Sequence, residues 1–175
     1  MEWTIQDLGA LGEFIGAFAV VITLIYLAVQ LRQNTQSLKL NVEKDIAIHI
    51  AQVNYDLAST SVSHVLIRAA ADISQLNDEE MAQFGAFANG FFRTHQLAHD
   101  QWLDGNLSRR SWESIKSHFR TQMASAGIKA FWDVRSPTFK PEFRDYVSGL
   151  DSGGVLSSAE VMQALKNPKA HSPRE

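Results

Sequence analysis

An uncharged apolar segment near the N-terminus constrains this 175-residue chain more than any other feature. The 18 consecutive residues from Phe14 to Leu31 carry no charged side chain. Counted from Leu8, the apolar segment is 24 residues long, and Glu13 is its one charged residue. An α-helix rises about 1.5 Å per residue, so a helix over 8–31 is roughly 36 Å long and can cross a hydrocarbon core of about 30 Å. The segment therefore predicts a transmembrane helix.

Two other kinds of apolar helix need to be weighed against this interpretation. A buried core helix of a soluble domain usually keeps a polar stripe along one side, and no such stripe is visible here. A cleaved signal peptide begins with basic residues and ends at a small-residue cleavage site. This N-terminus instead carries Glu2 and Asp7 with no Lys or Arg, and no such site follows. We therefore expect a retained membrane anchor.

The charges that flank the segment predict its orientation. The first 13 residues hold three acidic side chains and no basic one, whereas three basic residues follow the segment: Arg32, Lys39 and Lys44. Basic residues beside a membrane helix favour the cytoplasmic side. The sequence thus predicts an extracytoplasmic N-terminus over 1–7, a single span in the cell's inner (cytoplasmic) membrane, and a C-terminal domain in the cytoplasm.

Two features of the predicted span indicate contacts with other helices as well as membrane anchoring. Gly12 and Gly16 form a GxxxG pair, a spacing that lets helix backbones approach closely in lipid, although glycines are also common in membrane helices generally. Glu13 lies between them near the outer boundary, where an ionised carboxylate is costly unless it reaches the headgroups or faces a partner. The glycines predict self-association, and Glu13 is a candidate polar membrane site.

A long segment without helix breakers follows the span. No glycine or proline occurs between Gly16 and Gly85, so the helix can continue beyond Leu31. The hydroxyl-rich residues 58–61 predict its first interruption. Apolar residues at spacings of seven, four and three mark one face of this extension: Leu31, Leu38, Val42, Ile46, Ile50, Val53 and Leu57.

Capping signals and apolar periodicity predict more helices up to residue 150. A short helix is expected over 62–71, and a long one between a capping box at Asn77 and Glu80 and the pair Asp104–Gly105. Ser108 is expected to cap the next helix, which Gly127 ends or bends, and a short helix around Trp132 precedes a last helix that begins at Pro141. The long helix should bury one seam: Met81, Phe84, Ala88, Phe91, His95, Ala98 and Trp102.

These patterns together predict the fold class. No alternating run is long enough for a sheet, so we expect an all-α protein. In it, one N-terminal transmembrane helix over 8–31 continues into a helical extension and a cytoplasmic helical bundle over 32–150. Residues 151–175 are expected to form a flexible C-terminal tail.

Composition excludes several classes of function. The net charge of −3 lacks the basic excess that nucleic-acid binding requires. The chain has no cysteine, which excludes thiol catalysis, iron–sulfur clusters and cysteine-bound zinc. No phosphate-binding glycine loop, GxSxG motif or dinucleotide fingerprint occurs. We therefore expect neither a cofactor nor an enzyme activity.

One pair of histidines is a candidate metal site. His95 and His99 are four residues apart, so they share a helix face and could hold one metal ion, as in the HExxH motif. Gln96 stands where that motif has its general base, and nothing in the spacing requires His118 or Asp104 to complete a site. Because His95 lies on the apolar seam, a packed core histidine is the favoured interpretation.

Arginine residues are the other candidate group. An anion or lipid-headgroup site could form if they gathered in the fold, but ten acidic residues balance ten basic ones over 58–150. Scattered surface pairs are therefore the favoured interpretation. The residues in question are Arg68, Arg93, Arg109, Arg110 and Arg120.

Three stretches resemble a family of uncharacterised bacterial proteins. They are GEFIGAFAVVITLIYLAVQLRQNT over 12–35, FFRTHQLAHDQWLDGNLSRRSWE, and GIKAFWDVRSPTFKPEFRDYV. The resemblance covers roughly residues 8–150. Its most specific part is the span that runs into Gln30 and Arg32–Thr35, together with Trp132 and the start of the last helix at Pro141–Phe143. It implies one N-terminal membrane helix and a cytoplasmic helical domain, and it assigns no activity or catalytic residues to the chain.

Three functional hypotheses follow. The first is a single-pass membrane protein that acts in assembly or protein interaction, forming a homo-oligomer through Gly12 and Gly16 or contacting another membrane protein within the lipid bilayer. The alternative is an oligomeric channel with Glu13 near the pore mouth, for which Thr23 and Gln30 are the only polar candidates farther along the span. The least favoured is a metal-dependent enzyme that uses His95 and His99.

Overall fold

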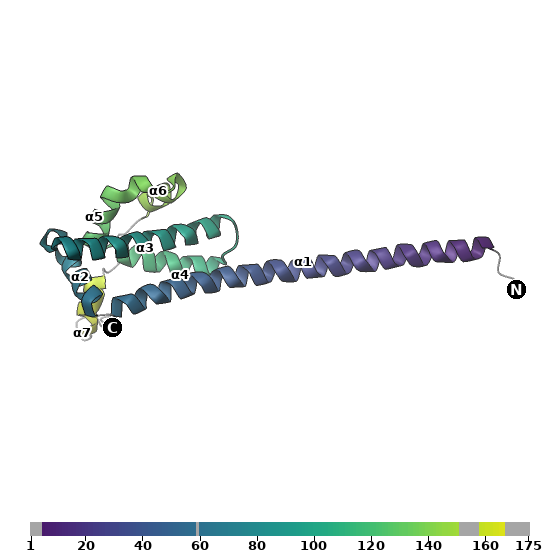
Figure 1. Ribbon diagram of the computed structural model, residues 1–175, viewed down its shortest axis with the longest axis horizontal. Coiled ribbons are helices and arrows are strands. Elements are labelled where there is room, and N and C mark those ends of the chain that lie inside the picture. The colour runs from purple at the N-terminus through teal and green to yellow at the C-terminus, as the bar shows by residue number, and fades with distance from the viewer. Residues whose placement is uncertain (1–4, 59, 151–157, 167–175) are drawn as a thin grey trace, which may run out of the picture. The chain divides into compact units, whose positions relative to one another are not determined.

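A computed structural model of the chain describes residues 5–58, 60–150 and 158–166. These residues form seven α-helices and two short 3-10 helices, and they contain no strand (Figure 1). The predicted all-α fold is confirmed. The helices are α1 (Ile5–Ala58), α2 (Thr60–Ala71), η1 (Ile73–Gln75), α3 (Asp78–Leu103), α4 (Arg109–Met123), α5 (Ala126–Arg135), η2 (Ser136–Thr138), α6 (Pro141–Ser148) and α7 (Ser158–Lys166).

Helix α1 is 54 residues long and contains both the predicted span and its extension. It ends at Ala58, where the hydroxyl-rich residues predict an interruption. The chain divides into two compact units, Met1–Asn41 and Val42–Glu175. In the first unit, every side chain that the structure describes is exposed. The most apolar 18-residue window of α1 has a mean hydropathy of 2.4, and none of it is buried.

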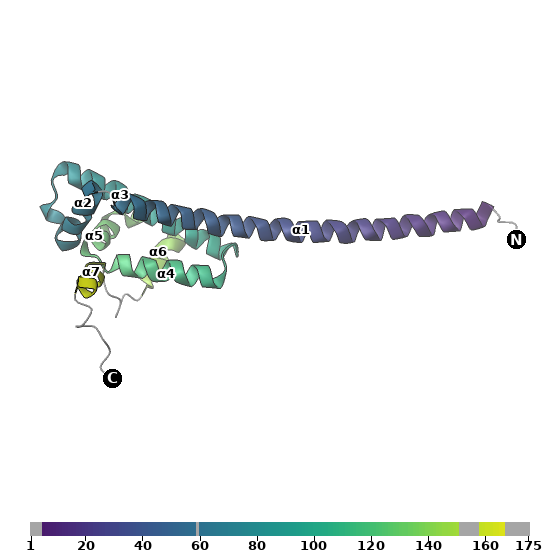
Figure 2. The same ribbon diagram turned by 90° about the horizontal axis from the view of Figure 1, so that it is seen from below.

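The second unit has an aromatic core. Helix α2 packs against α3 and α5, and α3 also packs against α4 and α6 (Figure 2). Phe92 of α3 is fully buried, and its ring centroid lies 4.8 Å from that of Trp132 and 5.8 Å from that of Phe119. The buried members of this core come from five helices and the residue after η2: Val65, Ala69, Phe84, Ala88, Phe91, Phe92, Phe119, Ile128, Trp132, Phe139, Phe143 and Val147.

A second cluster joins the last part of α1 to the bundle. Ile46 is 2% exposed and packs with Ala98, Leu107 and Trp112. Val42 and Ile50 pack beside it, as the spacing predicts. Only the later part of this apolar face is buried. Leu31 and Leu38 are 69% and 65% exposed, and both belong to the first unit.

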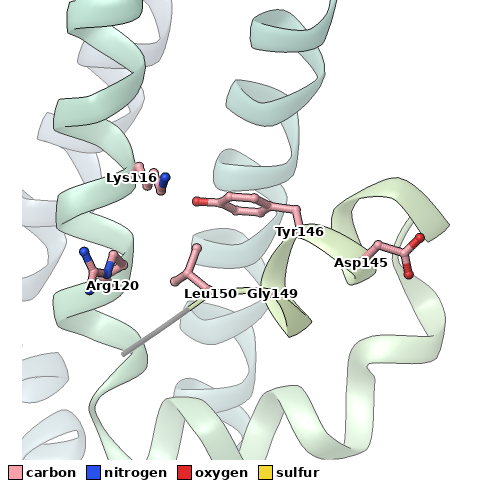
Figure 3. A pocket seen from close by; sticks show the side chains of 6 residues that line it. All are labelled: Lys116, Arg120, Asp145, Tyr146, Gly149 and Leu150. Carbon is pink, nitrogen blue, oxygen red and sulfur yellow. The ribbon is translucent and has the colours of Figure 1, made fainter. Parts of the chain in front are cut away.

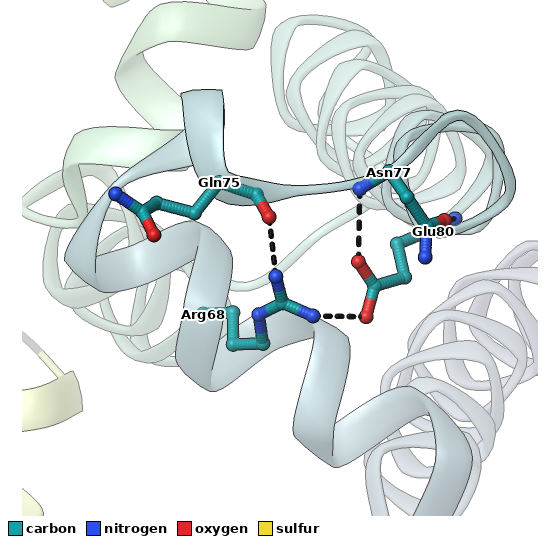
Figure 4. A network of polar contacts seen from close by, with 4 residues as sticks. All are labelled: Arg68, Gln75, Asn77 and Glu80. Carbon is teal, nitrogen blue, oxygen red and sulfur yellow. Dashed lines mark hydrogen bonds and ion pairs between the residues drawn. The ribbon is translucent and has the colours of Figure 1, made fainter.

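The predicted start of α3 is confirmed, and an arginine of α2 also binds to it (Figure 4). The Asn77 side chain accepts a hydrogen bond from the Glu80 backbone N–H, and the Glu80 carboxylate accepts one from the Asn77 N–H, both at 2.9 Å. Arg68 of α2 forms an ion pair with the same carboxylate and also donates to the Gln75 carbonyl. One arginine thus joins the end of α2 to the capping box of α3. The α3 seam is buried as predicted except at its ends, because Met81 is 39% exposed and Trp102 is only half-buried.

The expectation for Gly127 is wrong. Helix α4 ends at Met123, and Gly127 lies in the first turn of α5 instead of terminating the preceding helix. The structure gives a different reason for a glycine at this position. A Cβ atom on Gly127 would lie 2.5 Å from the backbone oxygen of Ala69, so α5 and α2 approach too closely for any side chain.

The remaining predicted boundaries agree with the structure. Helix α3 ends before Asp104, Gly105 adopts a φ of +70° as a glycine after a helix often does, and Ser108 caps α4. Pro141 begins α6. Within the predicted C-terminal tail, the structure has helix α7. Residues 151–157 and 167–175 of that tail, and residues 1–4 of the predicted N-terminal segment, lie outside the described residues.

Candidate functional site

Gly12, Glu13 and Gly16 lie on the exposed part of α1. A Cβ atom added to either glycine would meet no other atom within 4 Å, so the described part of the chain leaves this close-packing face uncovered. Glu13 is exposed as well. Gly12 and Gly16 are one helical turn apart and share a face, as the sequence predicts.

The two other polar residues of the predicted span bind within their own helix. The Thr23 hydroxyl donates to the carbonyl of Ala19 at 2.8 Å. The Gln30 amide donates to the hydroxyl of Tyr26 at 2.6 Å. Such local hydrogen bonds let polar side chains lie in a helix that faces lipid. The Thr23 hydroxyl proton and one Gln30 N–H are therefore satisfied without a water-filled pore.

His95 is a core residue, as the apolar seam indicates. It is 4% exposed, and its ring lies 4.3 Å from that of Phe91 and 4.7 Å from that of Phe119, measured between centroids. Its Nδ1 is 2.8 Å from the Phe91 carbonyl oxygen. A carbonyl only accepts hydrogen bonds, so Nδ1 carries the proton and donates it. Burial lowers the pKa of His95 to about 3, which the nearby His118 reinforces and the hydrogen bond to Phe91 partly opposes. His95 is therefore neutral at physiological pH.

Two more histidines lie beside His95 in the bundle. The ring of His118 on α4 stacks on that of His95, with centroids 5.7 Å apart and an interplanar angle of 10°. His99 stacks on Tyr146 of α6 at 4.7 Å. Burial lowers the pKa of both His99 and His118, although Asp100 and Glu142 partly oppose this shift at His99. Sequence spacing did not show that His118 and Tyr146 belong to this cluster, because they come from other helices, α4 and α6, and join it only through tertiary packing.

The histidines of this cluster are surrounded mainly by aromatic rings. Among the residues that the structure describes, no three His, Asp or Glu side chains are placed to hold one ion. Instead, the His95, His99 and His118 rings pack against aromatic rings. The pair His95 and His99 thus fills the interior between α3, α4 and α6.

Arg68 and Arg93, two of the arginines considered above, contact different parts of the bundle. Arg68 binds Glu80 and the Gln75 carbonyl at the start of α3. Arg93 lies over the Phe139 ring, with its guanidinium carbon 4.3 Å from the centroid, and donates to the Thr138 carbonyl at 3.2 Å. Arg120 lines a cavity between α4 and α6, which is described below. These contacts agree with the prediction, from the balance of charges, that the arginines are scattered over the bundle.

Glu43 makes a contact that the sequence did not predict. Its carboxylate accepts a hydrogen bond from the Ser108 backbone N–H at 2.8 Å. Ser108 is the N-cap of α4, where backbone N–H groups favour a negative charge. Hydrogen bonds to Ser108 lower the pKa of Glu43 accordingly. This contact supports the packing of Ile46 and Ile50 against α4.

The neutral histidines predict a pH dependence of stability. The unfolded chain takes up a proton at each histidine below about pH 6.5, whereas folded His95 does so only near pH 3. The unfolded state therefore binds more protons in this interval, and stability falls as pH falls. We expect His95 alone to remove about 1.4 kcal/mol of unfolding free energy per pH unit between about pH 6 and pH 5.

Chemical denaturation of the full chain in detergent at several pH values measures this slope. His95→Phe keeps an aromatic ring among Phe91 and Phe119 and should reduce the slope, whereas His64→Gln, which removes an exposed histidine, should not. An unchanged slope in His95→Phe would show that His95 does not remain neutral in the folded state.

Comparison of the chain with protein-family profiles, with curated proteins and with solved structures finds no match. The functional proposal therefore depends on the residues and contacts described above.

Proposed function

We propose that this chain is a single-pass membrane protein that acts in assembly or protein interaction. Its main support is the most apolar window of α1, which has a mean hydropathy of 2.4 and no buried residue. The core helix of a soluble protein would bury much of such a surface, because exposed apolar area in water is unfavourable. A lipid bilayer provides the missing apolar surroundings.

The orientation we propose follows the flanking charges. Arg32, Lys39 and Lys44 favour placing the second unit in the cytoplasm, and the acidic N-terminus favours the outer side of the inner membrane. The second unit, with its buried aromatic core, is then the cytoplasmic domain that contacts partners.

Self-association through the glycine face is the assembly mode we propose. Gly12 and Gly16 are exposed, with space for a neighbouring backbone at both positions. In lipid, helices associate through close van der Waals packing at such small residues. Glu13 lies next to this face and would then reach the headgroups or a polar group of a neighbouring helix. Assembly is favoured over conduction because Thr23 and Gln30 find partners within α1.

Replacing both glycines tests this proposal. Gly12→Leu with Gly16→Leu should weaken self-association by about tenfold or more, since two bulky side chains separate the backbones. Ala28→Leu is the matched control, because it adds similar bulk on the other side of the same exposed helix. Native mass spectrometry of the full chain in nanodiscs or detergent measures the mass of the complex. A monomeric parent protein, or a double variant that associates like the parent, would contradict the proposal.

A further inference from the structure

A cavity lies between α4 and α6, next to the histidine cluster with which it shares Tyr146. It has a volume of about 440 Å³, which falls in the usual range for small-molecule sites. Its lining combines two cations, one phenol, one carboxylate and an apolar wall (Figure 3). The lining residues are Lys116, Arg120, Asp145, Tyr146, Gly149 and Leu150.

The two cations come from one face of α4. Lys116 and Arg120 are one helical turn apart, and both are half-buried in the cavity wall. Figure 3 shows both side chains on the α4 side of the cavity, while the Asp145 carboxylate points away from them. Two partly desolvated positive charges thus line the cavity wall. Among the described residues, Lys116 forms no ion pair.

Tyr146 supplies a hydrogen-bond donor on the opposite side. Its ring packs on His99 and Phe143, and its hydroxyl points toward α4 near Lys116 (Figure 3). That hydroxyl is buried and has no hydrogen-bond partner among the described residues. Burial raises the pKa of Tyr146, and Glu113 adds to this effect while Arg120 opposes it. The hydroxyl therefore stays protonated and can donate.

A buried hydroxyl without a hydrogen-bond partner is energetically unfavourable. A ligand that accepts a hydrogen bond from it would remove this cost and would therefore bind more tightly. Figure 3 shows the Tyr146 hydroxyl directed toward Lys116, whose flexible side chain can rotate to bind an anion beside it. Gly149 and Leu150 offer an apolar wall to the uncharged part of the same ligand.

We propose that this cavity binds a phosphate group carried by a small molecule or a lipid headgroup. Lys116 and Arg120 neutralise its charge, and the Tyr146 hydroxyl donates to one of its oxygens. A phosphate group suits this set because it offers several acceptor oxygens and negative charge, up to two units on a monoester and one on the diester of a phospholipid. The cavity also has room for the group that carries the phosphate.

Titration of the full chain in a phosphate-free detergent with phenyl phosphate tests the site, with calorimetry as the measurement. We expect saturable binding to one site per chain. Lys116→Gln with Arg120→Gln should lower the affinity by about tenfold or more. Arg109→Gln with Lys129→Gln removes the same charge from exposed positions of α4 and α5, and should change the affinity by less than about twofold.

Tyr146→Phe separates binding from folding. It removes only the unpaired hydroxyl and keeps the ring contacts, so thermal stability should be maintained while affinity falls by about three- to tenfold. If the ligand is a lipid headgroup, nanodiscs that contain phosphatidylglycerol should show a lipid retained by the parent and lost from the Lys116/Arg120 variant, in native mass spectra.

The site is overturned if neither phenyl phosphate nor phosphatidylglycerol binds saturably, or if the control pair loses as much affinity as the cavity pair. It is also overturned if Tyr146→Phe binds either probe as tightly as the parent does.

Discussion

Gly127→Ala should destabilise the helical unit by about 3 kcal/mol, because α5 and α2 are in backbone contact at this position. The added Cβ would lie 2.5 Å from the Ala69 oxygen and 3.0 Å from the Ala69 carbonyl carbon. No side-chain rotation relieves a clash with backbone atoms, so one helix must shift. That shift disturbs Ile128 and Trp132, which pack in the core from the same helix. Urea denaturation of the full chain in detergent measures the effect.

Gly90→Ala is the matched control for this prediction. Gly90 is exposed within α3, and a Cβ there meets no atom within 4 Å. Alanine is favoured over glycine inside a helix by about 0.5–1 kcal/mol, so this variant should be slightly more stable than the parent. The same chemical change should thus have opposite signs at the two positions. Equal stability of the Gly127→Ala variant and the parent would show that α2 and α5 do not approach as closely as described.

Phe92→Ala should remove about 3–5 kcal/mol of unfolding free energy. Phe92 is fully buried, and its ring contacts those of Phe91, Phe119, Phe131, Trp132 and Phe139. Truncation leaves a cavity at the centre of the aromatic core, which rings held by several helices cannot easily fill. Thermal and urea denaturation of the full chain measure the loss.

Phe18→Ala makes the same truncation at a different kind of position. Phe18 is 60% exposed and lies in the first unit, so unfolding of the helical unit should be unaffected. If Phe92→Ala cost less than about 1 kcal/mol, the aromatic cluster would not be the main source of stability in this unit.

Local patterns were sufficient to predict most helix boundaries. The capping box at Asn77 and Glu80, the Gly105 stop and the Pro141 start all involve residues within a few positions of one another, so their chemistry is visible in the sequence. The buried position of His95 was also predictable, because its spacing from Phe91 and Ala98 places it on the apolar face of α3.

Contacts between different helices could not be predicted from local sequence patterns. Gly127 suggested a helix end, since glycine is common there, but its role depends on Ala69 in another helix. The facing of Tyr146 toward Lys116 and Arg120 depends on how α6 packs near α4, and the link from Glu43 to Ser108 joins residues 65 positions apart. Neither arrangement has a signal in spacing or composition.

The most direct test of the account is the location of two introduced cysteines. The chain has no cysteine of its own, so Gln6→Cys and Gly90→Cys each provide one unique label position. We expect both variants in the carbonate-washed membrane fraction. In intact spheroplasts, a membrane-impermeant maleimide should label Gln6→Cys alone, and Gly90→Cys should react only after lysis. Recovery of the chain in the soluble fraction, or labelling of Gly90→Cys in intact spheroplasts, would contradict the proposed membrane anchor or its orientation.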